Sequence, residues 1–296
     1  MKNVKTLIVV ALMGASLFAS STRTDALGGE AGFWAEDWAN VASFPADVNN
    51  HNVAWTDGSN FTSIFNADGT TWGFSGGTDA NDVVNMMWGN GTMGASFGLN
   101  MVPEDTNAGT DSETNFNVGF GMPLAGMDFG FTYDGSMVGV NLRRAQDVWL
   151  WDTMLINFDT TPEDTDAMTD AKMNFGVHCY SNTSYDSGTN GLFALGFDYG
   201  TVGDADATMN LVWNFAVESA MTDWATLRVG YIKSYDFGGG ANDAGAVSMG
   251  LGFNYGSFNL DMIIADYDAL FNNPVNYVTG RNGNDLGAGW TISYAW

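Results

Sequence analysis

The sequence has little cysteine and few charged residues. The only cysteine among 296 residues is Cys179, so no disulfide can form within one chain, and none follows the N-terminal apolar run to accept a lipid. Charged residues make up 15% of the chain, against about 25% in ordinary soluble domains. Hydrophobic residues nevertheless reach 45%. Much of the surface is therefore expected to contact something other than water.

Long apolar runs are also lacking. The longest lies at residues 7–18 and is shorter than the roughly 20 residues that a spanning helix needs, which excludes helical membrane proteins. Lys2 and Lys5 precede this run, and the small residues Ala19, Ser20 and Ser21 follow it. This pattern is typical of an export signal. It predicts a cleaved signal peptide over residues 1–21.

Basic residues are scarce: Lys and Arg number 9 against 34 Asp and Glu, for a formal net charge of −25. Such an excess of negative charge repels nucleic acid and excludes it as a partner. The acidity suits either a solvated surface or a pore mouth that attracts cations. Acidic residues gather at positions 103–113 and 159–170 and at 204 and 206. Their oxygens could bind Ca²⁺, although no EF-hand spacing is present, and no other cofactor is indicated.

Apolar residues alternate with small or polar ones in segments of about ten residues from position 84 onward. Residues 247–256 show this most clearly, with Val247, Met249 and Leu251 against Ser248 and Gly250. A soluble two-sheet sandwich also alternates, but its outward face carries more charge than the Gly, Ser, Asn and Ala found here. In lipid every backbone group must be paired, so alternating strands in a membrane imply a sheet closed into a barrel.

These segments predict an all-β fold over residues 51–296. The fold is a transmembrane antiparallel up-and-down β-barrel of about 14 strands, within a range of 12 to 16, after a short helical plug segment at residues 22–50. Tight turns at Ala125-Gly126 and Gly256-Ser257 are expected on the periplasmic side, with the acidic loops outside. Aromatic residues at segment ends, Trp55 among them, are expected at the membrane interfaces.

Two short regions resemble known outer-membrane proteins. The last strand alternates and ends with Tyr294 and Trp296, which resembles the signal read by the barrel-assembly machinery. Residues 23–46 are similar to the start of the long-chain fatty acid transporter family, with its glycine-rich start, its acidic "D-A-N" stretch and its "N-P-A" element, here with Phe44 where Asn is usual. The resemblance implies a segment that folds into the barrel interior as a plug. The alternative is a tail that merely leads into the first strand.

Five apolar residues are the candidates for this plug, because they are too apolar for an exposed tail and do not alternate. The spacing of 34, 38 and 41 predicts one face of a short helix. The candidates are Phe33, Trp34, Trp38, Val41 and Phe44.

Six charged or polar residues are candidates for lining the lumen and setting its selectivity. Basic side chains opposite Glu218 and Asp261 would create a transverse field, or would form salt bridges that only hold the barrel together. No metal site or catalytic motif is present: His51 and His178 lack neighbouring ligands, and G-x-S-x-G is absent. The candidates are Arg143, Lys172, His178, Glu218, Arg228 and Asp261.

Together these features predict a non-enzymatic, porin-like channel in the cell outer membrane. It would pass small solutes and prefer cations, with outer-membrane lipid and the barrel-assembly machinery as partners. One alternative is a structural or secretion-partner barrel with a filled lumen. The second, suggested by the N-terminal resemblance, is uptake of hydrophobic compounds.

Overall fold

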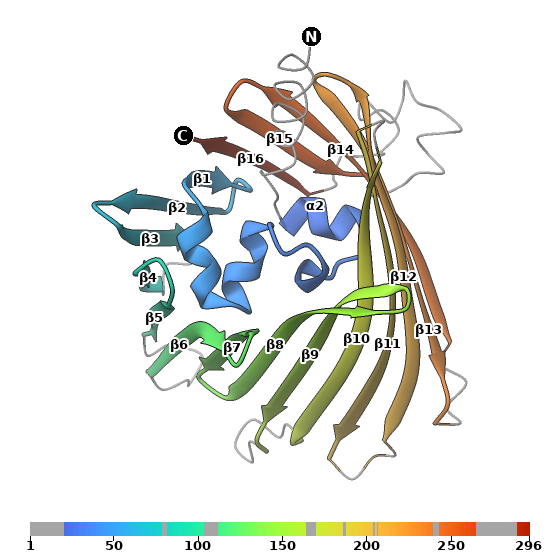
Figure 1. The fold of residues 1–296 in the computed structure, drawn as a ribbon. Helices are drawn as coiled ribbons and strands as arrows, with labels where there is room; N and C mark the ends of the chain where they lie inside the picture. Colours follow the sequence, from blue (N-terminus) through green and yellow to red (C-terminus); the bar gives the residue numbers. More distant parts are fainter. Residues whose placement is uncertain are drawn as a thin grey trace, which may run out of the picture.

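The computed structural model describes residues 21–78, 82–103, 112–163, 170–185, 188–203, 205, 207–238, 243–264 and 289–296. Sixteen strands within these ranges form one closed antiparallel barrel (Figure 1), at the upper end of the predicted range. They are β1 (Val53–Thr56), β2 (Asn60–Ala67), β3 (Thr70–Gly77), β4 (Asp82–Gly89), β5 (Gly94–Val102), β6 (Glu113–Leu124), β7 (Met127–Asp134), β8 (Met137–Val148), β9 (Trp151–Thr161), β10 (Lys172–Tyr185), β11 (Thr189–Val202), β12 (Thr208–Thr222), β13 (Ala225–Asp236), β14 (Ala244–Tyr255), β15 (Phe258–Ile263) and β16 (Trp290–Ala295).

The first and last strands close the barrel. β1 pairs with β16 in antiparallel register, Val53 opposite Ala295 and Ala54 opposite Tyr294. Every other strand pairs with its neighbours in the sequence, so the sheet has no unpaired edge. The ring of Tyr294 lies 6.0 Å from that of the exposed Trp296, which puts both aromatic residues of the C-terminus on the outer side of the closing strand.

Alternation along the strands separates an apolar outer face from a small or polar inner face. In β12, Phe215 is 47% exposed while the adjacent Asn214 is 2% exposed. Large apolar side chains remain exposed on strands all around the barrel, including Phe61, Phe97, Phe120, Phe197 and Ile292. This is the arrangement that the alternation predicted.

Tight turns lie at one end of the barrel. At Ala125-Gly126 both residues have positive φ, 53° and 77°, as a two-residue hairpin turn requires. The predicted Gly256-Ser257 turn joins β14 to β15 at the same end, where β1 begins and β16 finishes. The acidic segments join strands at the opposite end and lie mostly outside the described residues. The described residues contain no cluster of three or more His, Cys, Asp or Glu side chains suited to a metal ion.

Aromatic side chains surround the tight-turn end. Trp149, Trp224, Tyr255 and Trp296 are all exposed there. The prediction for Trp55 was wrong: its ring faces inward and stacks on Trp38 with the ring centroids 3.7 Å apart. In β1 the buried Val53 faces inward, and Trp55, two residues later, therefore lies on the same inner face.

The N-terminal segment, residues 21–50, lies inside the barrel (Figure 1). It contains α2 (Ser21–Ala26) and the 3₁₀ helices η1 (Ala31–Phe33), η2 (Trp38–Ala42) and η3 (Pro45–Asn50). α2 packs on β13 to β16 and η3 on β3 to β7, so the segment reaches opposite walls. No helix among the described residues is long and apolar enough to cross a membrane.

The single short helix expected across positions 34 to 41 is not formed. η1 ends at Phe33, and η2 begins only at Trp38. The Asp37 carboxylate accepts a hydrogen bond from the Ala39 amide, and the Asn40 side chain donates to the Trp34 carbonyl oxygen at 2.6 Å. Asp37 thus caps the start of η2, and Asn40 bonds the Trp34 carbonyl oxygen. These two bonds interrupt the helix between η1 and η2.

Inner-face glycines make room for the N-terminal segment. A Cβ at Gly94 would overlap the backbone of Pro45, one at Gly121 the backbone of Ala46, and one at Gly130 the carbonyl oxygen of Ser43. The overlapping atoms are backbone, so a side-chain rotation could not relieve the clash. The inner-face residues are therefore glycines where the backbone of the N-terminal segment lies directly against the wall.

Candidate functional site

The five predicted plug residues are all buried between the N-terminal segment and the inner wall. Phe33, Trp34 and Phe44 share one apolar cluster with Leu155 and Tyr180. Trp38 packs with Val53 and Ala295, and Val41 with Val48 and Ile64. Burying one such large side chain contributes about 1.5–3 kcal/mol relative to leaving it exposed.

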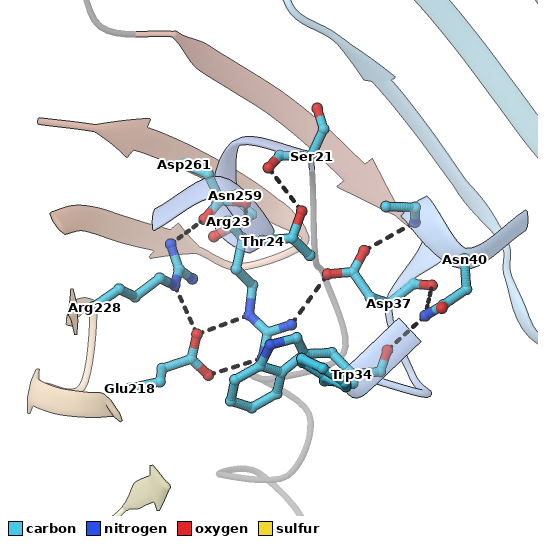
Figure 2. A network of polar contacts seen from close by, with 12 residues as sticks. Ser21, Arg23, Thr24, Trp34, Asp37, Asn40, Glu218, Arg228, Asn259 and Asp261 are labelled. Carbon is cyan, nitrogen blue, oxygen red and sulfur yellow. Dashed lines mark hydrogen bonds and ion pairs between the residues drawn. The ribbon is translucent and has the colours of Figure 1, made fainter. Parts of the chain in front are cut away.

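A buried ionic network joins α2 to the wall (Figure 2). The Arg23 guanidinium donates through Nε to Glu218 Oε2 at 2.8 Å and through Nη1 to Asp37 Oδ2 at 3.2 Å. Arg228 donates to the same Glu218 oxygen at 2.6 Å and to Asp261 Oδ1 at 2.6 Å. We call these five residues the Arg23 network. It links α2 and η2 to β12, β13 and β15.

Charge in the Arg23 network is unequal. It holds the three carboxylates of Asp37, Glu218 and Asp261 and the two guanidiniums of Arg23 and Arg228, all at most 5% exposed. Among these five buried residues the carboxylates outnumber the guanidiniums by one. Such a site favours uptake of a proton by one carboxyl group.

Arg23 is the central residue that the sequence did not single out. It is the one basic residue in an otherwise apolar and acidic stretch, and two candidate lumen carboxylates lay downstream. Its guanidinium also lies 4.9 Å from the centre of the Trp34 ring. The sequence features could have indicated that Arg23 is a buried cation, but they do not show which carboxylate pairs with it.

A second network ties η3 to β7 and β8. Arg143 donates through Nη2 to Asp47 Oδ2 and through Nε to Asp128 Oδ2, each at 3.0 Å. Its guanidinium lies 4.5 Å from the centre of the Phe44 ring. This Arg143 network again holds one more carboxylate than guanidinium.

The other predicted lumen residues are placed differently. Lys172 is exposed at the first residue of β10 and belongs to neither network. His178 is buried, with Nε2 2.9 Å from Asp198 Oδ1 and its ring edge-on to Phe33. The structure thus brings Arg228, Glu218 and Asp261 together, holds Arg143 at another wall, and leaves Lys172 and His178 outside both networks.

A cavity of about 330 Å³, here called the lumen cavity, lies beside the N-terminal segment. β9 to β13 form its wall, and Glu30 and Phe33 border it from the segment. Within the part of the chain that the structure describes, the nitrogen and oxygen of the buried Asn214 side chain and the Asn157 Oδ1 atom have no hydrogen-bond partner. The polar residues that line the cavity are Glu30 from the N-terminal segment and, from the inner face of the wall, Asn157, Asn174, His178, Asp198, Thr208, Asn210 and Asn214.

Burial shifts the pKa values of several groups in the N-terminal segment and the linker to β1, and Asp25 is one whose pKa it raises. Burial also raises the pKa of Asp37 to about 7 and that of Asp47 to about 6, while Arg23 and Arg143 oppose these increases. It lowers the pKa of His51 to about 4 because the imidazolium would lose its hydration.

No protein-family model and no curated protein matches this chain. Among solved structures, an anion-selective porin from Comamonas acidovorans aligns with a TM-score of 0.44 and 11% identity, covering 83% of this chain and 96% of that one. Two mutants of the Rhodopseudomonas blastica porin align with a TM-score of 0.37 and 11% identity, covering 80% of this chain and 89% of theirs. At this level of similarity no function is transferred. The N-terminal resemblance to the fatty acid transporter family gains no support.

Docking of the N-terminal segment should weaken as pH rises from roughly 6.5 to 8.5. The pKa of Asp37 is about 7 when the segment is docked, above the ordinary 3.8. The contribution of Asp37 to the stability of docking is therefore fully present below pH 3.8 and is lost as pH rises through 7. Across this window the loss is about 1 kcal/mol, or about fourfold in hydrogen-exchange protection factors for residues 31–44.

The Asp37→Asn variant is the control, because it removes the Asp37 carboxyl group and should keep only the smaller loss that Asp47, with a pKa of about 6, contributes. His51 has the opposite sign, since its lowered pKa removes stability only as pH falls below 6.5. The difference between wild type and variant in this window therefore isolates Asp37. Protection that rises with pH in the wild type would contradict the assignment.

Proposed function

We propose that this chain is an outer-membrane channel for passive passage of small polar solutes, with residues 22–50 occupying part of its lumen as a plug. One observation carries the proposal. Inside a closed barrel, the buried Arg23 network fixes the N-terminal segment to the wall through charged groups rather than leaving it as a free tail. Transport across such a barrel needs no covalent chemistry.

Membrane placement is supported by the outer face. Its apolar side chains are exposed all around, and no sheet edge is left unpaired. The exposed aromatic residues at the tight-turn end match a girdle at the lipid interface, which would make that end periplasmic. Tyr294 and Trp296 on the closing strand would then serve as the signal for the barrel-assembly machinery.

Export by a signal peptide over residues 1–21 fits the same proposal. Arg23 stands two positions beyond that cleavage point, and Thr22 contacts Thr291 of β16 with their hydroxyl oxygens 2.7 Å apart. Cleavage as late as Ala26 would remove both contacts. The interior contacts of Thr22 and Arg23 therefore favour cleavage after residue 21 over cleavage at Ala26.

Arg23→Gln should raise single-channel conductance or open probability in planar bilayers. The substitution leaves Asp37 buried without its ion-pair partner, and breaking a buried pair costs roughly 3–5 kcal/mol. Arg144→Gln is the matched control, because Arg144 is exposed on the same barrel and belongs to neither network. Equal currents for wild type, Arg23→Gln and Arg144→Gln would contradict a role of the segment in closing the pore.

The channel should also prefer cations. The lumen cavity presents Glu30 and Asp198, its described lining contains no Lys or Arg, and the arginines of both networks are outnumbered by carboxylates. In a KCl gradient at low salt, the reversal potential should indicate K⁺ selectivity that fades as salt rises. A reversal potential of anion-selective sign at low salt would overturn this preference.

The docked segment also favours a second candidate, a structural or assembly barrel whose lumen is filled. Silent bilayers for well-folded wild type and for Arg23→Gln would support it. Uptake of hydrophobic compounds is not favoured, because Asn, Asp and Glu side chains line the lumen cavity beside its apolar residues.

A further inference from the structure

We propose that the lumen cavity is a binding subsite for an uncharged, polyhydroxylated ring compound of mono- or disaccharide size. The inference rests on the proposed channel function and names the class of solute. The lumen cavity has a volume of about 330 Å³. This lies at the small end of the range for ligand sites and suits one or two sugar rings.

The polar wall matches hydroxyl groups. Four asparagine side chains line the cavity from three strands of the same wall: Asn157 on β9, Asn174 on β10, and Asn210 and Asn214 on β12. An amide both donates and accepts hydrogen bonds, as does a hydroxyl group, so a polyol can satisfy several amides at once. Asn174 is exposed and Asn210 half-buried, so a solute can reach them directly.

Unsatisfied polar atoms lie at the base of this wall. Asn214 is only 2% exposed, and neither the nitrogen nor the oxygen of its side chain has a partner among the described residues; the same holds for Asn157 Oδ1. Buried amides are normally paired, and an unpaired one is destabilising. Hydroxyl groups entering the cavity would supply the missing partners.

An apolar patch lies beside the amides. Phe33 borders the cavity from the N-terminal segment, and Ala194, Val212 and Ile232 face it from β11, β12 and β13. Sugar rings combine hydroxyl edges with C–H faces that pack on aromatic and aliphatic groups. The lining therefore offers both kinds of contact that one ring requires.

The charged groups favour an uncharged solute. Both acidic side chains are already engaged: Glu30 accepts from the Gly32 amide at 2.9 Å, and Asp198 lies 2.9 Å from His178 Nε2. No Lys or Arg among the described residues lines the cavity to hold an anion. Each carboxylate already has a partner, whereas the Asn157 and Asn214 amide atoms have none among the described residues, so the groups left to recognise a solute are neutral.

The test is titration calorimetry on the refolded full-length barrel in an amine-oxide detergent, since maltoside detergents carry the proposed ligand chemistry. The probes are glucose, maltose, glucosamine and glucose 6-phosphate. Glucose or maltose should bind saturably and more tightly than the charged sugars. Asn210→Leu should weaken that binding about tenfold, because hydrogen bonds to the solute are lost.

Asn117→Leu is the matched control, since it makes the same change at a half-buried inward position of β6 outside the cavity. Heat-modified mobility on gels shows that each variant is folded. The proposal is overturned if neither neutral sugar binds, if a charged sugar binds more tightly, or if Asn210→Leu binds like Asn117→Leu. Binding at equilibrium does not require ion conduction, so a silent bilayer with saturable binding would refute only the channel.

Discussion

The guanidinium of Arg23, held between Glu218 and Asp37, joins two parts of the chain that the sequence separates by nearly two hundred residues. A charged group enters a water-poor interior only with its partners in place. The wall supplies Glu218 with Arg228 and Asp261 behind it, and η2 supplies Asp37. The position of α2 and of the start of η2 against β12 follows from satisfying this one cation.

Shape and charge act on the segment together. Gly94, Gly121 and Gly130 let the backbone of residues 43–46 lie directly against β5, β6 and β7, where side chains would hold it away. Arg143 fixes the same region through Asp47. With Arg23 at β12, the segment is attached at two separate walls. Each attachment carries one carboxylate in excess, which makes docking sensitive to protons as well as to contacts.

Alternation predicted the barrel and its two faces because lipid and lumen impose different side chains on successive residues. It also identified Arg228, Glu218 and Asp261, since scarce charges on the inner face must find one another. The strand number was less accessible: β1 has four residues, too few to show a period. The inward ring of Trp55 and the lumen cavity depend on contacts between distant segments, which no local pattern records. The helical break at Asp37 and Asn40 is local, but the apolar spacing of positions 34, 38 and 41 took no account of these side-chain caps.

The docked position of the N-terminus is most directly tested by a disulfide between α2 and β16. Thr22→Cys with Thr291→Cys, in a Cys179→Ser background, places two thiols where hydroxyl oxygens now lie 2.7 Å apart. Mild oxidation of the membrane-inserted barrel should join them, as peptide mass spectrometry would detect. Thr22→Cys with Thr71→Cys, on the inner face of β3, should stay reduced. Free thiols in the first pair, or equal crosslinking in both, would contradict a segment fixed inside the barrel.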